Sequence, residues 1–174
     1  MNPMPRAAKL ALATLLLLPL AALAKTSDRD QPMTVDAASQ SGSMLDDNGT
    51  IHYAGNVVIV QGSLEVHADA ADLYRKNGDI ERIVLTGKQA TLKQQMDDGT
   101  WMNGRADTIE YQAKADTIVL TGNYKVDSPK GSNAGQRMVY NTKTGNMESG
   151  GDGTRVHTVI QPKNKTAAPA PQGR

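Results

Sequence analysis

The chain has 174 residues, a formal net charge of +1, no cysteine and no phenylalanine. The lack of cysteine excludes thiol catalysis, zinc–thiolate sites and disulfide bonds. No basic block follows the first ten residues, which argues against nucleic-acid binding because neutralising phosphates requires clustered Lys and Arg. The only aromatic residues are five Tyr and one Trp, so the core must come from aliphatic side chains, which suits a thin sheet structure.

The first 24 residues have the pattern of a secretory signal peptide. Arg6 and Lys9 form a short basic region, Leu10–Leu23 is almost entirely apolar, and Ala22-Leu23-Ala24 is a small-x-small cleavage site. The apolar run contains a proline and is shorter than the roughly 20 residues of a membrane-spanning helix, which argues against an uncleaved anchor. We therefore expect residues 1–24 to be removed after Ala24 and the mature protein to be exported.

The middle of the chain predicts β-strands. Val57–Val60 is a β-branched run, and Ser63–Asp69 alternates polar and apolar residues with the period of a half-buried strand. A two-residue turn at Gln61-Gly62 would pair Ile59 with Leu64 and Val57 with Val66, so that all four share one face. The best helix candidate, Ala68–Lys76, is short and ends at a turn signal. An all-β protein is therefore expected.

Internal repetition is the strongest organisational signal. Ile83–Lys88 is nearly repeated by Ile118–Asn123, with an earlier relative at Ile51–Asn56 and a looser one at Met147–Gly151. Repeats of about 30 residues indicate a stacked array in which neighbouring units bury each other's faces. Each unit is expected to supply a few short strands.

The residues that could carry chemistry are scattered. His52, His67 and His157 are far apart in sequence and lack metal-ligand spacing, so each is expected on an exposed strand face. The carboxylate pairs Asp46-Asp47 and Asp97-Asp98 run directly into glycine turns, where Asp forms local hydrogen bonds. We therefore predict no catalytic residues, no metal site and no cofactor.

Three segments together resemble the OstA-like family of lipopolysaccharide transport proteins, in its LptA-like branch. They are Tyr53–Gly62 followed by Leu64-x-Val66-x-Ala68-Asp69, the Val119–Asn123 motif, and the opening Asp30-Gln31-Pro32-Met33-x-Val35. The similarity runs from about Asp30 to Ile160, so we assign residues 25–161 to one OstA-like domain. The Pro- and Ala-rich residues 162–174 are expected to be a disordered tail.

The resemblance implies an open, twisted stack of antiparallel strands, a V-shaped semi-barrel or β-jellyroll. It also implies a periplasmic carrier that holds the lipid A acyl chains of lipopolysaccharide in an apolar groove and helps to move the molecule from the inner to the outer membrane. Proteins of this type associate head to tail. They connect LptC-like inner-membrane proteins to LptD-like outer-membrane proteins.

Two sets of site residues follow. Family positions and the predicted hairpin face together give the expected lipid-binding residues: Met33, Val35, Val57, Ile59, Leu64, Val66, Leu92, Ile109, Tyr111 and Ala113. Leu92 and Ala113 are smaller than the side chains expected there, which suggests a wider groove. The expected assembly edges are Met33, Thr34 and Val35 on the first strand and Val156, Thr158 and Ile160 on the last.

Two other functions stay open at this point. A periplasmic scaffold could bind proteins by strand addition without carrying lipid, and the same apolar residues would then form an ordinary sheet core. An enzyme acting on envelope glycans would need acidic residues that converge on a cleft, which the scattered Asp and Glu do not suggest.

Overall fold

The structure, a computed structural model, describes residue 28, residues 30–151 and residues 153–162. The expected signal peptide and residues 163–174 of the expected tail lie outside this part of the chain. Within it the protein is almost entirely β-structure, as expected, and no helix is long and apolar enough to cross a membrane. The elements are β1 (Met33–Asp36), β2 (Ser39–Ser41), β3 (Gly49–Gln61), β4 (Leu64–Lys76), β5 (Asp79–Gln95), β6 (Trp101–Gln112), the 3₁₀ turn η2 (Ala113–Ala115), β7 (Thr117–Ser128), β8 (Gly131–Asn141), β9 (Met147–Ser149) and β10 (His157–Ile160).

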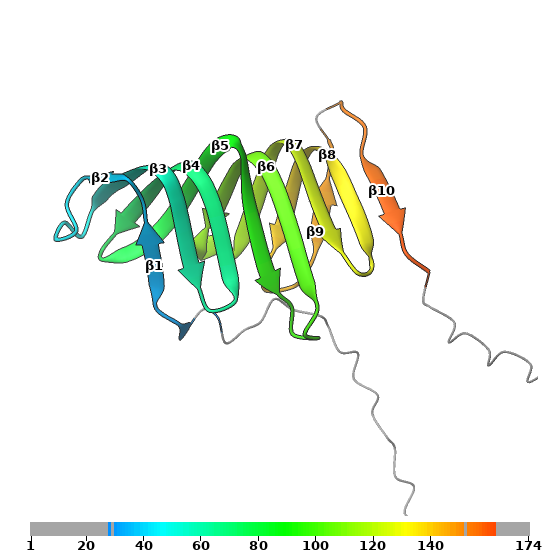
Figure 1. Cartoon of the computed structure of the whole chain (residues 1–174), viewed down its shortest axis with the longest axis horizontal. Coiled ribbons are helices and arrows are strands. Elements are labelled where there is room, and N and C mark those ends of the chain that lie inside the picture. The colour runs from blue at the N-terminus through cyan, green and yellow to red at the C-terminus, as the bar shows by residue number, and fades with distance from the viewer. Residues whose placement is uncertain (1–27, 29, 152, 163–174) are drawn as a thin grey trace, which may run out of the picture.

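All strand pairs are antiparallel and form one open sheet (Figure 1). The order is β1-β3-β4-β5-β6-β7-β8-β10, with β2 also pairing with β3 and β9 with β8. Each of the long strands β3 to β8 therefore lies beside its neighbour in sequence, as short turns between antiparallel strands allow. The sheet does not close on itself, because β1 and β10 stand at opposite ends. The expected open stack of antiparallel strands is confirmed.

Each long strand crosses a line of β-bulges near its middle. The pairing shifts between Ala54 and Val57 in β3, and corresponding shifts interrupt every later pair of long strands. Bulges bend a strand and increase its twist. The strands bend over along this line (Figure 1), and the buried residues on both sides of it belong to a single core cluster.

We name the two parts of the sheet on either side of the bulge line half-sheets A and B. Half-sheet A consists of β1, β10 and residues 57–61, 64–68, 90–95, 101–106, 124–128 and 131–135. Half-sheet B consists of β2, β9 and residues 49–54, 70–76, 79–86, 108–112, 117–121 and 137–141. The buried apolar residues of both half-sheets belong to the core cluster between them.

The bulge line explains the sequence repeats. Gly55 and Gly122 lie on it with φ of 82° and 79°, a backbone region that favours glycine. A Cβ on Gly122 would overlap the carboxylate of Asp107, so the glycine also provides space. The looser fourth repeat, Met147–Gly151, ends in the connection between β9 and β10, which pair with β8 on either side of the same line. The recurring glycines Gly55, Gly87 and Gly122 therefore mark where β3, β5 and β7 bend.

The expected register of the β3–β4 hairpin is wrong by two residues. Gln61 pairs with Leu64, Ile59 with Val66 and Val57 with Ala68, so the turn is Gly62-Ser63. Gly62 has a φ of 59°, and a type II′ hairpin turn requires glycine at its first central position. Because the error is an even number of residues, the inward face is unchanged, as expected from the alternation of side chains along a strand.

Candidate functional site: an apolar groove between the half-sheets

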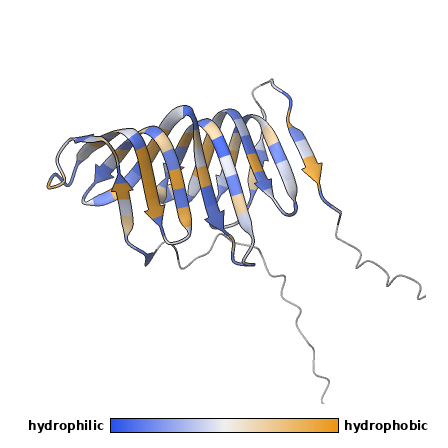
Figure 2. Cartoon of the chain, in the orientation of Figure 1, coloured by the Kyte–Doolittle hydropathy of each residue, from blue (hydrophilic) through white to orange (hydrophobic). Residues whose placement is uncertain are grey.

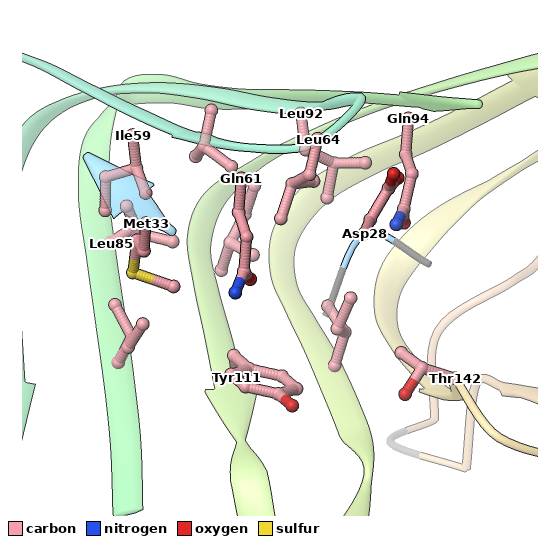
Figure 3. Close-up of a pocket in the computed structure, with 14 residues that line it drawn as sticks. Asp28, Met33, Ile59, Gln61, Leu64, Leu85, Leu92, Gln94, Tyr111 and Thr142 are labelled. Atoms are coloured by element: carbon pink, nitrogen blue, oxygen red, sulfur yellow. The ribbon is translucent and has the colours of Figure 1, made fainter. Parts of the chain in front are cut away.

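A pocket lies between the two half-sheets near the β1 end (Figure 3). The space inside it, counted together with the part open to solvent, is about 780 Å³. Half-sheet A contributes Met33, Ile59, Leu64, Val66 and Leu92, and half-sheet B contributes Ile83, Leu85, Ile109, Tyr111 and Ile118. The lining is thus largely aliphatic and comes from six strands, β1 and β3 to β7.

Strand parity places these side chains. Ile59, Val66 and Leu92 occupy one row across three neighbouring strands of half-sheet A. Leu85 pairs with Ile109 in half-sheet B. Side chains alternate between the two faces of a sheet, so every second residue on each side of the bulge line points inward. On each bent strand, apolar residues point inward on both sides of the bulge. Each strand therefore contributes apolar side chains to both half-sheets of the groove.

Seven of the ten residues expected to contact lipid line this pocket: Met33, Ile59, Leu64, Val66, Leu92, Ile109 and Tyr111. The structure places the other three elsewhere. Val57 is fully buried in the core, and Val35 is half-buried and packs against the core from β1. Ala113 lies in η2, in the turn between β6 and β7, and is not part of the pocket lining.

Sequence reasoning missed three apolar residues of the lining, namely Ile83, Leu85 and Ile118. Their signal was present in the sequence. All three lie in the two near-identical repeats at Ile83–Lys88 and Ile118–Asn123, directly before the glycine that begins the bend. The same position in each repeat therefore supplies a groove residue.

Polar residues at one side of the pocket were also missed. Asp28, Gln61, Gln94 and Thr142 line it together with the apolar residues (Figure 3). Asp28 is only 5% exposed, and its carboxylate accepts a hydrogen bond from the Ser63 hydroxyl. Asp28 is buried because it packs closely against Gly62 in the β3–β4 turn.

Strands with one free edge stand at both ends of the sheet. β1 pairs only with β3, and β10 pairs only with β8. Met33, Thr34 and Val35 lie in β1, and Thr158 and Ile160 lie in β10, as expected, whereas Val156 precedes β10 by one residue. Ile160 is 82% exposed, and such uncovered edges favour pairing with another strand.

The polar side chains do not form a reactive centre in the described part of the chain. His52 and His67 are exposed, and they pair with Asp72 and Glu65 at 2.7 Å. Asp46 caps its own turn through the backbone N–H of Asn48 at 2.9 Å. No group of three or more His, Asp or Glu in that part could hold a metal ion. What the groove offers a ligand is apolar surface and shape.

Hydrogen bonds perturb one carboxylate in a turn. Hydrogen bonds from the Thr100 side chain and then from Lys130 lower the pKa of Asp98 to about 2. The Lys130 Nζ lies 2.9 Å from Asp98 Oδ2 and so connects the β5–β6 turn to the β7–β8 turn. Asp98 therefore acts as a link between turns.

Comparisons with known proteins identify a matching family and relatives that are described in similar terms. Residues 34–146 match the family described as "LptA/(LptD N-terminal domain) LPS transport protein". The lipopolysaccharide export system protein LptA of Escherichia coli K12 is 32% identical over 167 residues, which cover 91% of this chain and 89% of that protein. The lipopolysaccharide export system protein LptH of Pseudomonas aeruginosa is 33% identical over 154 residues, covering 83% and 87%.

A solved structure has the same fold. The crystal structure of Pseudomonas aeruginosa LptH, described as the LptA-homologous periplasmic component of the conserved lipopolysaccharide transport device, superposes with a TM-score of 0.70. It is 29% identical to this chain, and the match covers 78% of this chain and 99% of that one. The bent, open sheet is therefore shared with a protein of this type.

Proposed function

Because the chain belongs to the LptA/(LptD N-terminal domain) family of LPS transport proteins, we propose that it carries lipopolysaccharide with the acyl chains in the groove between its half-sheets. The observation that carries this proposal is the apolar pocket lined from both half-sheets, from Leu64 and Leu92 on one side to Leu85 and Ile109 on the other. The protein works in the periplasm after removal of residues 1–24. It carries its cargo without changing it chemically.

The energetics of an acyl chain explain why a groove is needed. Burying one methylene contributes about 0.8 kcal/mol, so a chain of a dozen carbons gains roughly 10 kcal/mol on leaving water. Several such chains make free diffusion through an aqueous compartment prohibitively costly. A groove built from repeated units offers similar apolar contacts along its length, so that the lipid can move without entering a deep trap.

The free edges support assembly into a bridge. β1 of one copy pairs with β10 of the next, through Met33, Thr34 and Val35 on one side and Val156, Thr158 and Ile160 on the other. Such head-to-tail contacts use two different surfaces and therefore extend rather than close. The terminal copies pair in the same way with LptC-like proteins of the inner membrane and LptD-like proteins of the outer membrane. Light scattering tests this, because a strict monomer at high concentration would contradict it.

Site-specific photo-crosslinking in cells tests the cargo. A photoreactive amino acid at Tyr111, which lines the groove, should form adducts with lipopolysaccharide. The matched control is Glu65, which lies on β4 next to the groove residues Leu64 and Val66 but is exposed on the opposite face. Adducts at both positions, or at neither in a folded and assembled protein, would contradict the groove.

A scaffold that binds proteins by strand addition is the second candidate, because the free edges of β1 and β10 are suited to it without any lipid. Assembly without adducts at Tyr111 would favour the scaffold.

A further inference from the structure

The loop that connects β2 to β3, residues 42–48, exposes two large apolar side chains. Met44 is 59% exposed and Leu45 is 95% exposed. The loop projects at the β1–β2 end of the sheet, and its tip is one of the hydrophobic parts of that end (Figures 1 and 2). Single exposed apolar residues are common on protein surfaces, so the two side chains alone do not identify a contact site.

The loop is held in place by Arg75 of β4. The guanidinium group donates hydrogen bonds to the carbonyl oxygens of Met44 at 2.8 Å, Asp46 at 3.0 Å and Gly78 at 3.1 Å. The backbone N–H of Gly78 also donates to the carbonyl oxygen of Asp47 at 3.0 Å. A loop that is already ordered loses little conformational entropy on binding, which is how preorganised contact surfaces gain affinity.

The two ends of the sheet lie in the same residue rows. Following the strand pairs across the sheet, the row that begins at Thr34 in β1 ends at Val159 in β10. The row that begins at Ser41 in β2 ends at Glu148 in β9. The chain runs from half-sheet A to B through β1 and β2, and from B to A through β9 and β10. A next copy added at this edge is therefore antiparallel along both half-sheets.

Continuing the rows into a second copy places the β8–β9 turn, residues 142–146, beside the 42–48 loop. The 42–48 loop follows Ser41 and the β8–β9 turn precedes Met147, so both lie beyond this shared row on the side away from the bulge line. Asp46 and Lys143 are exposed, and the side chain of Asp47 is 75% exposed. The loop thus presents two carboxylates at one end of the molecule, and the turn presents one lysine at the other.

We infer that the 42–48 loop is a docking surface, separate from the strand edge, that receives the β8–β9 turn of the preceding copy. Leu45 packs against that turn and the half-exposed Met147 beside it, and the carboxylates of Asp46 and Asp47 face Lys143. This inference rests on the head-to-tail assembly proposed above and specifies its register. The loop selects the correct partner end, because complementary charges affect specificity and association rate more than affinity.

The chain has no cysteine, so engineered cysteines report on the joint without background. One copy carries Thr34→Cys and the other Val159→Cys, two positions on the outer face that share a row. Opposed residues of an antiparallel pair are close enough for a disulfide. Cross-linking between a Thr34→Cys variant and a His157→Cys variant would detect a register shifted by two residues. The fraction of disulfide-linked pairs is measured against protein concentration.

Loop variants are then introduced into the Thr34→Cys copy. Leu45→Ser should raise the concentration needed for half-maximal cross-linking about tenfold, as for a buried apolar interface residue. Asp46→Asn combined with Asp47→Asn should raise it by roughly threefold, and less at high salt because exposed charges are screened. Asparagine keeps the Oδ1 acceptor that caps Asn48. The matched control is Asp79→Asn, at an exposed aspartate that begins β5, and it should have no effect.

A charge exchange gives the sharpest test. Asp47→Lys in one copy and Lys143→Glu in the other should each weaken the joint, and mixing the two variants should restore it. If the loop variants and the control behave alike while the cysteines at positions 34 and 159 still cross-link, the 42–48 loop is not a docking surface. The head-to-tail assembly would still be supported. Cross-linking of Thr34 to His157 alone would overturn the register. If the loop variants weakened only the binding of a different protein that adds a strand at this edge, the partner of the 42–48 loop would not be a second copy of this chain. If no pair cross-links and the protein stays monomeric, the proposed assembly itself fails.

Discussion

Gly122 shows how one missing side chain allows a strand to bend. Its φ is 79°, and a Cβ there would overlap the carboxylate of Asp107 on the neighbouring strand. The neighbouring Asn123 donates a hydrogen bond from Nδ2 to the same carboxylate at 3.0 Å. Glycine thus relieves both backbone strain and crowding at the bend, which accounts for its recurrence in the sequence repeats.

The substitution Gly122→Ala should lower the free energy of unfolding by about 2–4 kcal/mol, since it adds a clash to the roughly 1–2 kcal/mol cost of a left-handed conformation. Chemical denaturation measures the change. Gly99→Ala is the matched control, because Gly99 has a similar φ of 78° but nothing within 4 Å of its Cβ position. Equal losses for the two variants would show that crowding at Asp107 is unimportant.

Asp98 gives a prediction for the dependence of stability on pH. Hydrogen bonds from Thr100 and Lys130 lower its pKa from an ordinary 3.8 to about 2 in the folded protein. A depressed pKa means that the carboxylate stabilises the fold above pH 4, and that this contribution is lost as the pH falls through about 2. The stability difference between the wild type and Asp98→Asn should therefore shrink from pH 5 to pH 2. A difference that stays constant over this range would contradict the assigned pKa.

At the scale of elements, Ser63 joins three segments of the chain. Its hydroxyl donates to the buried carboxylate of Asp28 and accepts a hydrogen bond from the backbone N–H of Gln95 at 3.1 Å. The side-chain amide of Gln61 adds a bond to the carbonyl oxygen of Gln31 at 3.1 Å. The segment before β1 is thereby attached to the β3–β4 turn and to the end of β5.

We expect Ser63→Ala to cost about 1–3 kcal/mol of stability, because a buried acceptor that loses its donor retains its full desolvation penalty. The free energy of unfolding and the susceptibility of the N-terminal segment to limited proteolysis should both report the change. Ser41→Ala, at an exposed strand position, serves as control. An effect no larger than that of the control would show that the segment is held by other contacts.

Sequence patterns predicted the elements more reliably than their detailed pairing. The alternation around Val57 and Val66 identified the strands and their inward face, because period-two patterning survives an even error of register. The turn itself was misplaced, since the position that Gly62 occupies in a two-residue turn depends on backbone twist and not on composition. Burial of Asp28 was unpredictable for a similar reason, because it depends on a contact with a turn 34 residues away.

At the scale of the molecule, the bent sheet converts repeated short motifs into one groove. Sequence reasoning identified most of the lining but also placed Val35, Val57 and Ala113 in it, and it missed Ile83, Leu85 and Ile118. The sequence patterns did not reveal the line of bulges. The bulges change which alternate residues of each strand point inward, and so decide which apolar residues of half-sheet B face the groove. Family resemblance alone could not supply that parity.

Equilibrium binding measurements show whether the groove holds acyl chains. Purified protein should be titrated with lipopolysaccharide and, in parallel, with the same molecule after complete removal of its acyl chains. We expect binding only to the acylated form, because the lining offers apolar contacts worth about 0.8 kcal/mol per methylene. Equal affinity for both forms would contradict the groove as the lipid site and would show that the protein recognises the sugar part of lipopolysaccharide instead.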